Sequence, residues 1–228
     1  MDQISDTGSS YPLTLPNADI FAESMIKLGI HMEDILVVYD TYETGLYFSP
    51  RVAWTCLHFR HQRIHVLNNF PGYVDAGFPI STGKFSINSE SVPQVKYPQP
   101  LPDPRKVISF TELRDLLTAK EKYQIIDVRI PDKFSQDGHM PTALNIPLAS
   151  ILSSDKLLLP ATELKTMFTN AGVQENLPAV LTCNSGVTAA ALDLALGVSG
   201  FRMERRLYDG SWMEWQDRVD ADGLIVID

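Results

Sequence analysis

Apolar and polar positions along the chain follow two different periods. Short apolar runs, typical of strands in a buried sheet, occur at residues 35–40, 64–67, 124–128, 179–183 and 206–208. Helical spacing of apolar residues occurs over 49–60, 110–119 and 187–197, and in two stretches that end near Gly29 and Gly172. Strands that alternate with helices predict an α/β fold with a mostly parallel sheet and helices on both faces.

Prolines interrupt this alternation once. Five of the 15 prolines fall between Pro93 and Pro104, a density that excludes a helix interior or a central strand. We therefore expect an extended linker over residues 87–105. It separates a first domain, residues 1–86, from a second domain, residues 106–228.

The two sides of this linker resemble each other. A helix end, a strand and a loop recur at a constant offset of 143 positions, which relates Asp40 to Cys183. Any two α/β units share some order, but the constant offset favours an internal duplication. The second copy has about fifty residues before Leu159, whereas the first has fourteen before Leu15. We therefore expect one complete domain and an incomplete copy that lacks its first strands and helix.

The charge balance and the cysteine count limit the class of protein. Lys and Arg number 19 and Asp and Glu number 28, and the net charge of −9 argues against a dedicated nucleic-acid-binding protein. No apolar run approaches the roughly 20 residues that span a membrane. The first ten residues resemble neither a secretory signal nor a transit peptide. Two cysteines cannot form a disulfide framework, which indicates a reducing compartment inside the cell.

The most informative segment is the loop at residues 183–189, with the sequence CNSGVTA, between a predicted strand and a predicted helix. Ligands of parallel sheets bind at the carboxyl ends of strands, where Cys183 lies. The unpaired amides and the dipole of a helix N-terminus favour the thiolate, the nucleophilic form of cysteine. Gly186 allows the backbone to curl around an anion, and Ser185 and Thr188 offer hydroxyl donors. Cys56, in a helical apolar pattern, is expected to be structural.

Two chemistries use a thiolate in such a loop. A phosphatase needs an arginine that clamps the phosphate, but the position six residues after Cys183 is Ala189. The short, neutral loop instead suits a smaller group, such as one sulfur atom added to the cysteine. Sulfur transfer is therefore preferred over phosphoryl transfer.

Several segments together make a family resemblance specific. They are CNSGVT at 183–188, GHMP at 138–141, YDGSWMEW at 208–215 and, in the first copy, VVYD at 37–40 and SPR at 49–51. On these motifs the chain resembles the tandem rhodanese-type sulfurtransferases, which include the thiosulfate and 3-mercaptopyruvate enzymes. Residues 51–55 and 67–70 look most like fungal members, which are similar to a sulfurtransferase that feeds tRNA thiouridine synthesis.

The resemblance implies a rhodanese-like three-layer fold and a catalytic role for Cys183, which would carry the sulfur as a persulfide. The corresponding residue of the first copy, Asp40, cannot carry one, so that copy would be catalytically silent. Substrate-binding residues would come from the loop and from the segment after the 124–128 strand. They are Asn184, Ser185, Gly186, Val187, Thr188, Arg129 and Lys133.

The donor is left open between 3-mercaptopyruvate and thiosulfate. Asn184 and Ser185 are closer to the Gly-Ser of the mercaptopyruvate enzymes than to the Arg-Lys of the thiosulfate enzymes. Lys133, however, stands where the mercaptopyruvate enzymes have an arginine, and it loses the bidentate fork. The insertion that carries a further arginine in those enzymes is absent here, as is the first-domain segment with their histidine and acidic residue.

The sequence thus predicts a sulfurtransferase of the cytoplasm or mitochondrion that moves sulfur from a small anionic donor to a thiol or a sulfur-carrier protein. No cofactor, metal, membrane or direct nucleic-acid partner is expected, and the incomplete first domain is expected to promote oligomer formation. The alternatives are a non-catalytic rhodanese-type binding module and, third, a cysteine phosphatase.

Three other groups of residues receive structural interpretations. His139 is expected to hydrogen-bond a turn, and Trp212 and Trp215 to close the core. The basic cluster of His58, His61, His65, Arg60 and Arg63 is expected to be a solvated helix end rather than a contact with RNA.

Overall fold

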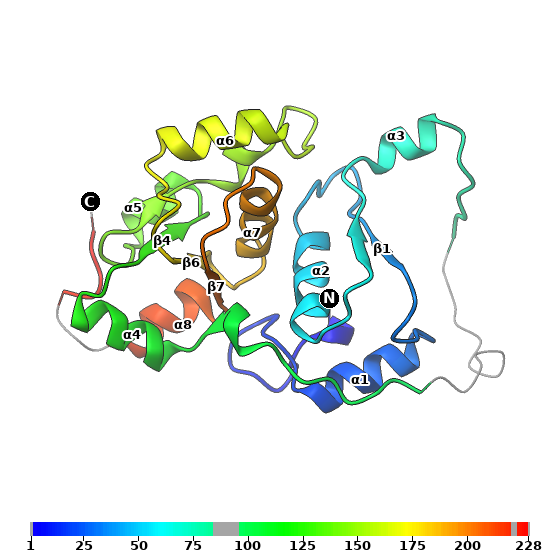
Figure 1. Ribbon diagram of the computed structural model, residues 1–228, viewed down its shortest axis with the longest axis horizontal. Helices are drawn as coiled ribbons and strands as arrows, with labels where there is room; N and C mark the ends of the chain where they lie inside the picture. Colours follow the sequence, from blue (N-terminus) through cyan, green and yellow to red (C-terminus); the bar gives the residue numbers. More distant parts are fainter. Residues whose placement is uncertain (1, 84–95, 220–222, 228) are drawn as a thin grey trace.

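The computed structural model describes residues 2–83, 96–219 and 223–227, which form two halves side by side (Figure 1). The first half, residues 2–83, contains η1 (Asp2–Ile4), α1 (Ala18–Lys27), β1 (Leu36–Val38), α2 (Ser49–His58), β2 (Ile64–Val66) and α3 (Phe70–Asp75). The second half, from residue 104 onward, contains η2 (Pro104–Lys106), β3 (Val107–Ile108), α4 (Phe110–Ala119), β4 (Gln124–Asp127), α5 (Pro131–Gln136), β5 (Leu144–Asn145), η3 (Leu148–Ile151), α6 (Ala161–Asn170), β6 (Ala179–Thr182), α7 (Ala189–Val198), β7 (Arg205–Tyr208) and α8 (Ser211–Arg218).

The second half is built on one five-stranded parallel sheet. Its strand order is β3-β7-β6-β4-β5, so β6 lies at the centre. On one side β6 pairs with β4, with Ala179 opposite Gln124, and on the other with β7, with Ala179 opposite Arg205. The predicted α/β class with a mostly parallel sheet is confirmed.

Alternate residues of the central strands face two separate cores. Ile125 and Val180 face a core closed by α4 and α8, which includes Trp212 and Trp215. The neighbouring strand residues face a larger core closed by α6 and α7. This period of two places helices on both faces of the sheet and gives three layers (Figure 1).

The first half repeats part of this order around a smaller sheet. After α1, strands β1 and β2 pair in parallel, with Leu36 opposite Ile64, and α2 connects them as α7 connects β6 and β7. Within the described residues, β2 is the only strand partner of β1, whereas β6 has two. Val37 and Tyr39, on the outer side of β1, are 56% and 51% exposed. The smaller sheet therefore leaves apolar surface uncovered.

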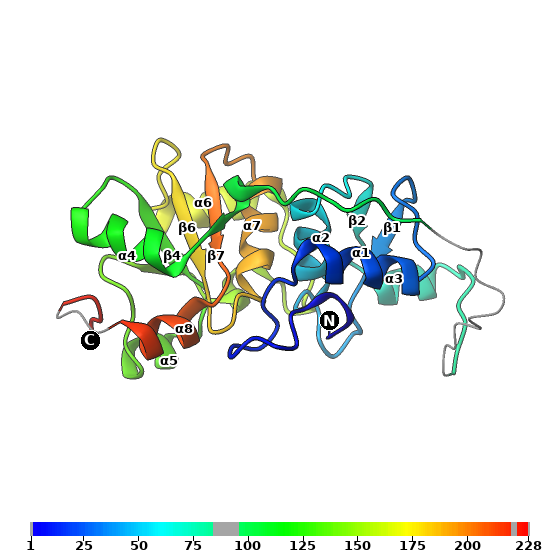
Figure 2. The same cartoon turned by 90° about the horizontal axis from the view of Figure 1, so that it is seen from below.

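The segment after residue 95 runs back along the first half rather than hanging free (Figure 2). Tyr97 is 6% exposed and packs edge-on against Phe21 of α1, with ring centroids 5.9 Å apart. Asp103 is buried and donates its amide to the carbonyl of His58 at 2.9 Å. Residues 87–95 of the predicted linker lie outside the described residues, and 96–105 pack as an ordered strap.

This strap explains why one interpretation is wrong in part. His58 and His61 are 6% and 0% exposed and are not solvated. The other members of the cluster, Arg60, Arg63 and His65, are exposed as expected. The His61 ring lies 3.0 Å from the Tyr97 hydroxyl and 3.0 Å from the carbonyl of Asp34. The sequence pattern of α2 could not reveal a cover that comes from forty residues further along the chain.

The two halves share a packed interface between α2 and α7 (Figure 1). Trp54 of α2 is 4% exposed and belongs to the core that α7 closes in the second half. The alanines of α7 leave room for this large ring, since four of the buried residues in that helix are Ala189, Ala190, Ala191 and Ala195. Core packing therefore holds α2 in place against α7, the helix that follows the loop 183–188.

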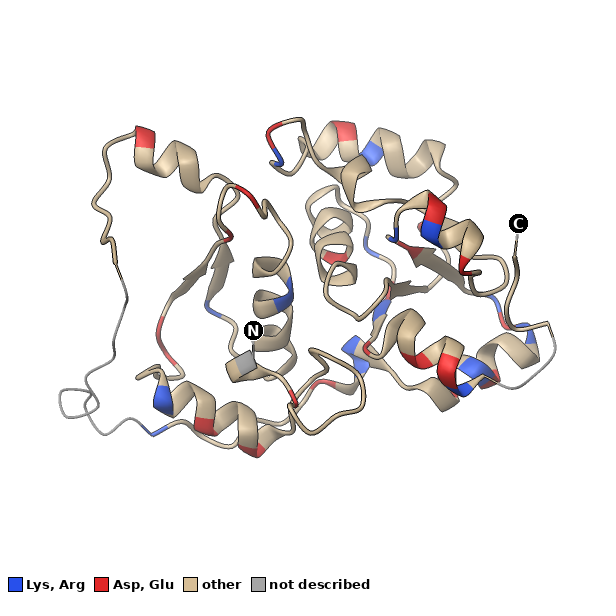
Figure 3. Ribbon diagram, turned by 180° about the vertical axis from the view of Figure 1, so that it is seen from behind, with Lys and Arg blue, Asp and Glu red and all other residues tan. Residues whose placement is uncertain are grey.

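Charges are dispersed over this framework. In Figure 3 basic and acidic positions are interspersed along the helices of both halves. Among the described residues, no helix is both long and apolar enough to cross a membrane.

Candidate active site

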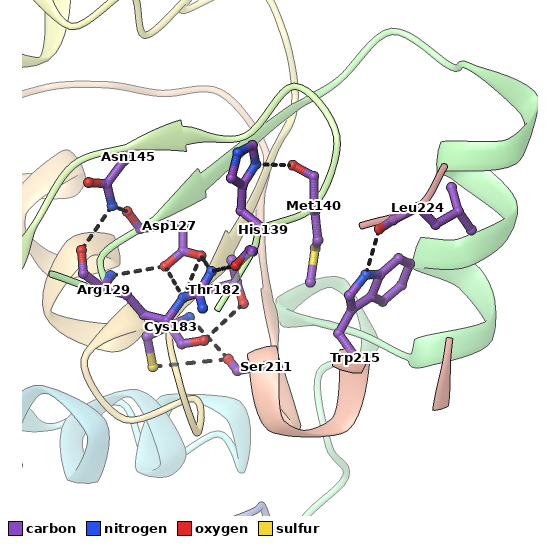
Figure 4. Close-up of polar contacts among 11 residues, drawn as sticks. Asp127, Arg129, His139, Met140, Asn145, Thr182, Cys183, Ser211, Trp215 and Leu224 are labelled. Atoms are coloured by element: carbon purple, nitrogen blue, oxygen red, sulfur yellow. Dashed lines mark hydrogen bonds and ion pairs between the residues drawn. The ribbon is translucent and has the colours of Figure 1, made fainter. Parts of the chain in front are cut away.

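Cys183 directly follows the central strand β6 and opens the loop 183–188 that leads into α7 (Figure 4). Its side chain is almost fully buried, with 2% of the residue exposed. The predicted place at a carboxyl strand end, before a helix N-terminus, is confirmed. Cys56, by contrast, lies within α2, and burial raises the pKa of its thiol to about 12.

The first residues of α8 hold the cysteine from the neighbouring strand end. The amide of Cys183 donates to the hydroxyl of Ser211 at 3.2 Å, and this hydroxyl donates to the carbonyl of Tyr208 at 2.8 Å. Ser211 Oγ also lies 4.0 Å from Cys183 Sγ. Ser211 is fully buried and has φ +50°, a strained conformation for a side-chain-bearing residue. The hydroxyl is thus held beside the sulfur at a conformational cost.

The loop offers its amides to a ligand. Within the described part of the chain, the N–H groups of residues 184–188 donate to no protein acceptor. Asn184 is exposed, Ser185 and Thr188 are half-buried, and Val187 is buried. The loop residues named from the sequence are therefore brought together around Cys183, as an open set of donors.

Gly186 shapes this loop. Its φ is +76°, and a Cβ there would lie 2.3 Å from the carbonyl oxygen of Asp209. Only glycine tolerates both the left-handed conformation and this approach. The expectation of a backbone curl at Gly186 is confirmed.

Arg129 lies behind the loop rather than open to solvent. Its guanidinium pairs with Asp127 at 2.8 Å, donates to the carbonyl of Gly138 at 2.8 Å and stacks over the ring of Trp212 at 4.3 Å. The side chain is 4% exposed. Much of its charge is neutralised by Asp127, so its contact with a donor stays a prediction.

Lys133 lies further out, on the short helix α5. Its side chain is 59% exposed, and its ammonium pairs with Asp137 at 3.4 Å. Nearby, His139 donates from Nδ1 to the carbonyl of Met140 at 2.8 Å (Figure 4). Its ring also stacks on that of Phe134. The interpretation of His139 as a turn residue is confirmed, and so is the burial of Trp212 and Trp215.

The first half contributes groups to the site that the sequence did not indicate. Arg51 of α2 donates to the carbonyl of Gly186 at 3.2 Å and forms an ion pair with Asp209. Tyr47 precedes α2, and burial, followed by the charge of the nearby Cys183, raises the pKa of its phenol. Residues that contact the loop after Cys183 therefore come from both halves.

The equivalent place in the first half is already filled by a side chain. The carboxylate of Asp40 accepts the amides of Tyr47 and Phe48 at 3.1 Å and that of Ser49 at 2.8 Å. It also accepts the hydroxyl of Ser49 at 2.7 Å. The amides that a ligand would need are used by the protein itself.

Some of the missed residues had a usable signal. Asp209 and Ser211 follow β7, which neighbours β6, so the strand-end rule that selected Cys183 also applies to them. Arg51 stood only within the motif SPR at 49–51, and nothing local gave its role, because Gly186 and Asp209 lie more than 130 positions away in the sequence. Among the described residues, no group of three or more His, Cys, Asp and Glu side chains could hold a metal ion.

This site has three parts: a buried thiol at the end of a central parallel strand, an open loop of amides, and a helix that starts behind them. It defines the class of α/β proteins that hold a small anionic group on or beside a cysteine.

Comparisons with known proteins narrow that class. The family model "Rhodanese-like domain" matches residues 109–218. The mouse 3-mercaptopyruvate sulfurtransferase is 32% identical over 99% of this chain and 77% of its own length. The chicken thiosulfate sulfurtransferase is 30% identical over 96% of this chain and 76% of its own length. The crystal structure of Tum1 from Saccharomyces cerevisiae superposes with a TM-score of 0.88, with 28% identity over 99% of this chain and 80% of that chain. The chain belongs to the rhodanese-type sulfurtransferase family that includes the 3-mercaptopyruvate and thiosulfate enzymes.

Proposed function

We propose that this protein is a sulfurtransferase that carries one sulfur atom on Cys183 from a small anionic donor to a thiol or protein acceptor. The observation that carries the proposal is the loop 183–188, whose amides donate to no protein acceptor among the described residues and directly follow a thiol before the N-terminus of α7. Such a loop stabilises the thiolate and the terminal sulfur of a persulfide, which is itself an anion.

The reaction has two displacement steps. The Cys183 thiolate attacks the transferable sulfur of the donor, and an S–S bond forms. The bond from that sulfur to the rest of the donor breaks, and the leaving group takes the electron pair, as pyruvate enolate from 3-mercaptopyruvate or as sulfite from thiosulfate. An acceptor thiolate then attacks the outer sulfur, and the electron pair of the S–S bond returns to Cys183.

Each part of the site has a role in these steps. The amides of residues 184–188 and the hydroxyls of Ser185 and Thr188 would receive the negative charge on the outer sulfur. The Ser211 hydroxyl, 4.0 Å from Sγ, can turn its proton toward the thiolate when the sulfur is charged. Lys133, exposed on α5, and Arg129, behind the loop, would attract the donor.

The domain assignment follows from a comparison of Cys183 with Asp40, the corresponding residue of the first half. The segment after residue 105 would be the catalytic domain, and residues 1–86 a silent, incomplete copy in which Asp40 occupies the place of the thiol. Asp40 supports this assignment because its carboxylate takes up the amides of Tyr47, Phe48 and Ser49.

The proposal also concerns the sulfur donor, the sulfur acceptor and the cellular compartment of this protein. The names of the relatives cover both 3-mercaptopyruvate and thiosulfate, and one Arabidopsis relative is named a mitochondrial enzyme. We propose that this protein acts in the cytoplasm or mitochondrion and that its acceptor passes the sulfur on to tRNA thiolation. The exposed outer side of β1 supports the alternative of a binding module.

The test compares donors on the wild-type chain and on Cys183→Ser. After incubation with 3-mercaptopyruvate or with thiosulfate, intact mass spectrometry should find a +32 Da adduct on the wild type and none on the variant. Cys56→Ser is the matched control and should keep the adduct, because that buried thiol lies inside α2. Equal results for wild type and Cys183→Ser with both donors would contradict the proposal.

A further inference from the structure

Arg51 is a buried cation of the first half whose ion-pair partner, Asp209, belongs to the second half. The residue is 1% exposed and sits on α2. Its guanidinium donates to the carbonyls of Gly186 and Leu13, both at 3.2 Å, and pairs with Asp209. It also lies 5.0 Å from the ring centroid of Trp54. Both strong contacts across the interface go to residues next to the thiol.

Gly186 and Asp209 belong to the two segments that enclose Cys183. Gly186 lies in the middle of the amide loop, and its backbone passes so close to the Asp209 carbonyl that no side chain fits between them. Asp209 stands two residues before Ser211, whose hydroxyl accepts the amide of Cys183. One guanidinium thus ties together the loop and the turn that carries the hydroxyl.

This contact is costly if it serves stability alone. The guanidinium of Arg51 is removed from water and the carboxylate of Asp209 largely so, and Nε of Arg51 is buried without a hydrogen-bond partner among the described residues. Buried ion pairs of this kind are often replaced by apolar side chains with no loss of stability. A planar, doubly donating group is instead suited to holding two acceptors at fixed separation.

We propose that Arg51 is a positioning residue of the sulfur-transfer site, which acts from the first half by fixing Gly186 and Asp209 around Cys183. The inference rests on the function proposed above. It gives the catalytically silent half a role in the reaction. It also assigns a role to Asp209, whose carboxylate pairs with Arg51 and so links the first half to the turn that carries Ser211.

The first test replaces Arg51 with Met, which keeps the length and apolar stem of the side chain and removes its donors. We expect the limiting rate of persulfide formation, at saturating donor, to fall by about 10-fold to 100-fold, because small misplacements at a reacting centre have effects of this size. The donor concentration for half-maximal rate should change less than threefold, since Arg51 touches the loop and not the donor. Arg51→Lys should recover part of the rate.

Arg205 provides the matched control. It also pairs with an aspartate, Asp193 at 2.6 Å, and donates to a backbone carbonyl, that of Phe201 at 2.8 Å, but it lies at the other end of β7. Arg205→Met should lower the melting temperature and leave the limiting rate of persulfide formation within twofold of the wild type.

A double variant keeps the test valid if Arg51→Met does not fold. Arg51→Met/Asp209→Asn removes both charges, and its melting temperature should approach that of the wild type while its limiting rate stays low. Recovery of both quantities, or a limiting rate in any folded Arg51 variant equal to that of the wild type, would overturn the inference and leave the proposed function standing. Absence of the adduct from the wild type would instead refute the proposed function.

Discussion

At Gly186 a single hydrogen in place of a side chain decides whether the active loop can form. Its φ of +76° lies in the left-handed region, and the Asp209 carbonyl fills the space where a Cβ would stand. The backbone of the loop can pass this close to Asp209 only if this curl is kept. The geometry of the loop therefore depends on one residue that has no side chain.

Gly186→Ala is expected to slow persulfide formation by at least about tenfold and to destabilise the fold. The left-handed conformation costs an alanine about 1–2 kcal/mol, and the overlap with Asp209 adds about 1–3 kcal/mol. Intact mass spectrometry with time and urea unfolding measure the two effects.

Gly172→Ala is the control for this variant. Gly172 has φ +88° but no atom within 4 Å of the added Cβ, so only the conformational cost remains. It should lose about 1 kcal/mol and keep the rate of persulfide formation. Equal rates for Gly186→Ala and the wild type would show that the loop does not need this curl.

Sequence reasoning reached some of these residues and not others. Cys183 and Gly186 could be located because a strand end, a loop and a helix start are local patterns. Arg129 was expected to attract a donor. The sequence pattern did not show that its guanidinium pairs with Asp127, two residues earlier. Arg51 stood within a family motif, but its role depends on long-range packing that no local pattern reveals.

At the scale of elements, the start of α4 shows how a helix is tied to the sheet. Ser109 and Glu112 form a capping box, and the carboxylate of Glu112 also pairs with Arg206 of β7 at 2.9 Å. The bond from Arg206 and then that from the Ser109 backbone lower the pKa of Glu112 to about 2. The charged form of Glu112 therefore holds the helix to the strand.

This pairing predicts a pH-dependent contribution to stability. Because the folded state lowers the pKa from its ordinary value of 4.5, the contribution is complete above about pH 5 and is lost as the pH falls toward 2. Glu112→Gln should unfold about 1 kcal/mol more easily than the wild type at pH 7, a figure reduced by solvent screening of the half-exposed side chain. Urea unfolding from pH 7 to pH 3 should show the difference shrinking, and a constant difference would contradict the assignment.

Most elements were predictable because they carry a clear apolar period. The helix predicted at 110–119 and the strand predicted at 124–128 match α4 and β4 to within one residue. The helices α3, α5 and α8 were not predicted. Each begins at or just before a proline or a small polar residue, which in a sequence indicates a turn. Tertiary contacts, such as the hydrogen bond from the Trp212 amide to the Cys183 carbonyl, stabilise the helix there instead.

At the scale of the whole molecule, the outer side of β1 is the least protected surface. Two hollows of about 570 Å³ and 820 Å³ flank the strand, and Val37 and Tyr39 line both. Ile35, in step with these two residues, is 57% exposed. An apolar strand with a free edge tends to pair with another chain.

We expect the protein to self-associate as its concentration rises and Val37→Lys to weaken this association, because a charge on an edge strand opposes pairing. Sedimentation velocity over a range of concentrations measures the effect. Val198→Lys, at an exposed apolar position in α7, should behave as the wild type. A wild type that stays monomeric at every concentration would contradict the expectation.

Trp54 sits in the first half but is part of the core of the second, next to the alanines of α7. A larger residue at Ala191, for instance, would have to be matched by a smaller one at position 54 for both to remain packed. The two halves therefore cannot diverge independently over generations: a lineage that loses the first half must first rebuild the surface of α7. This shared core gives a physical reason for the two halves to be inherited together.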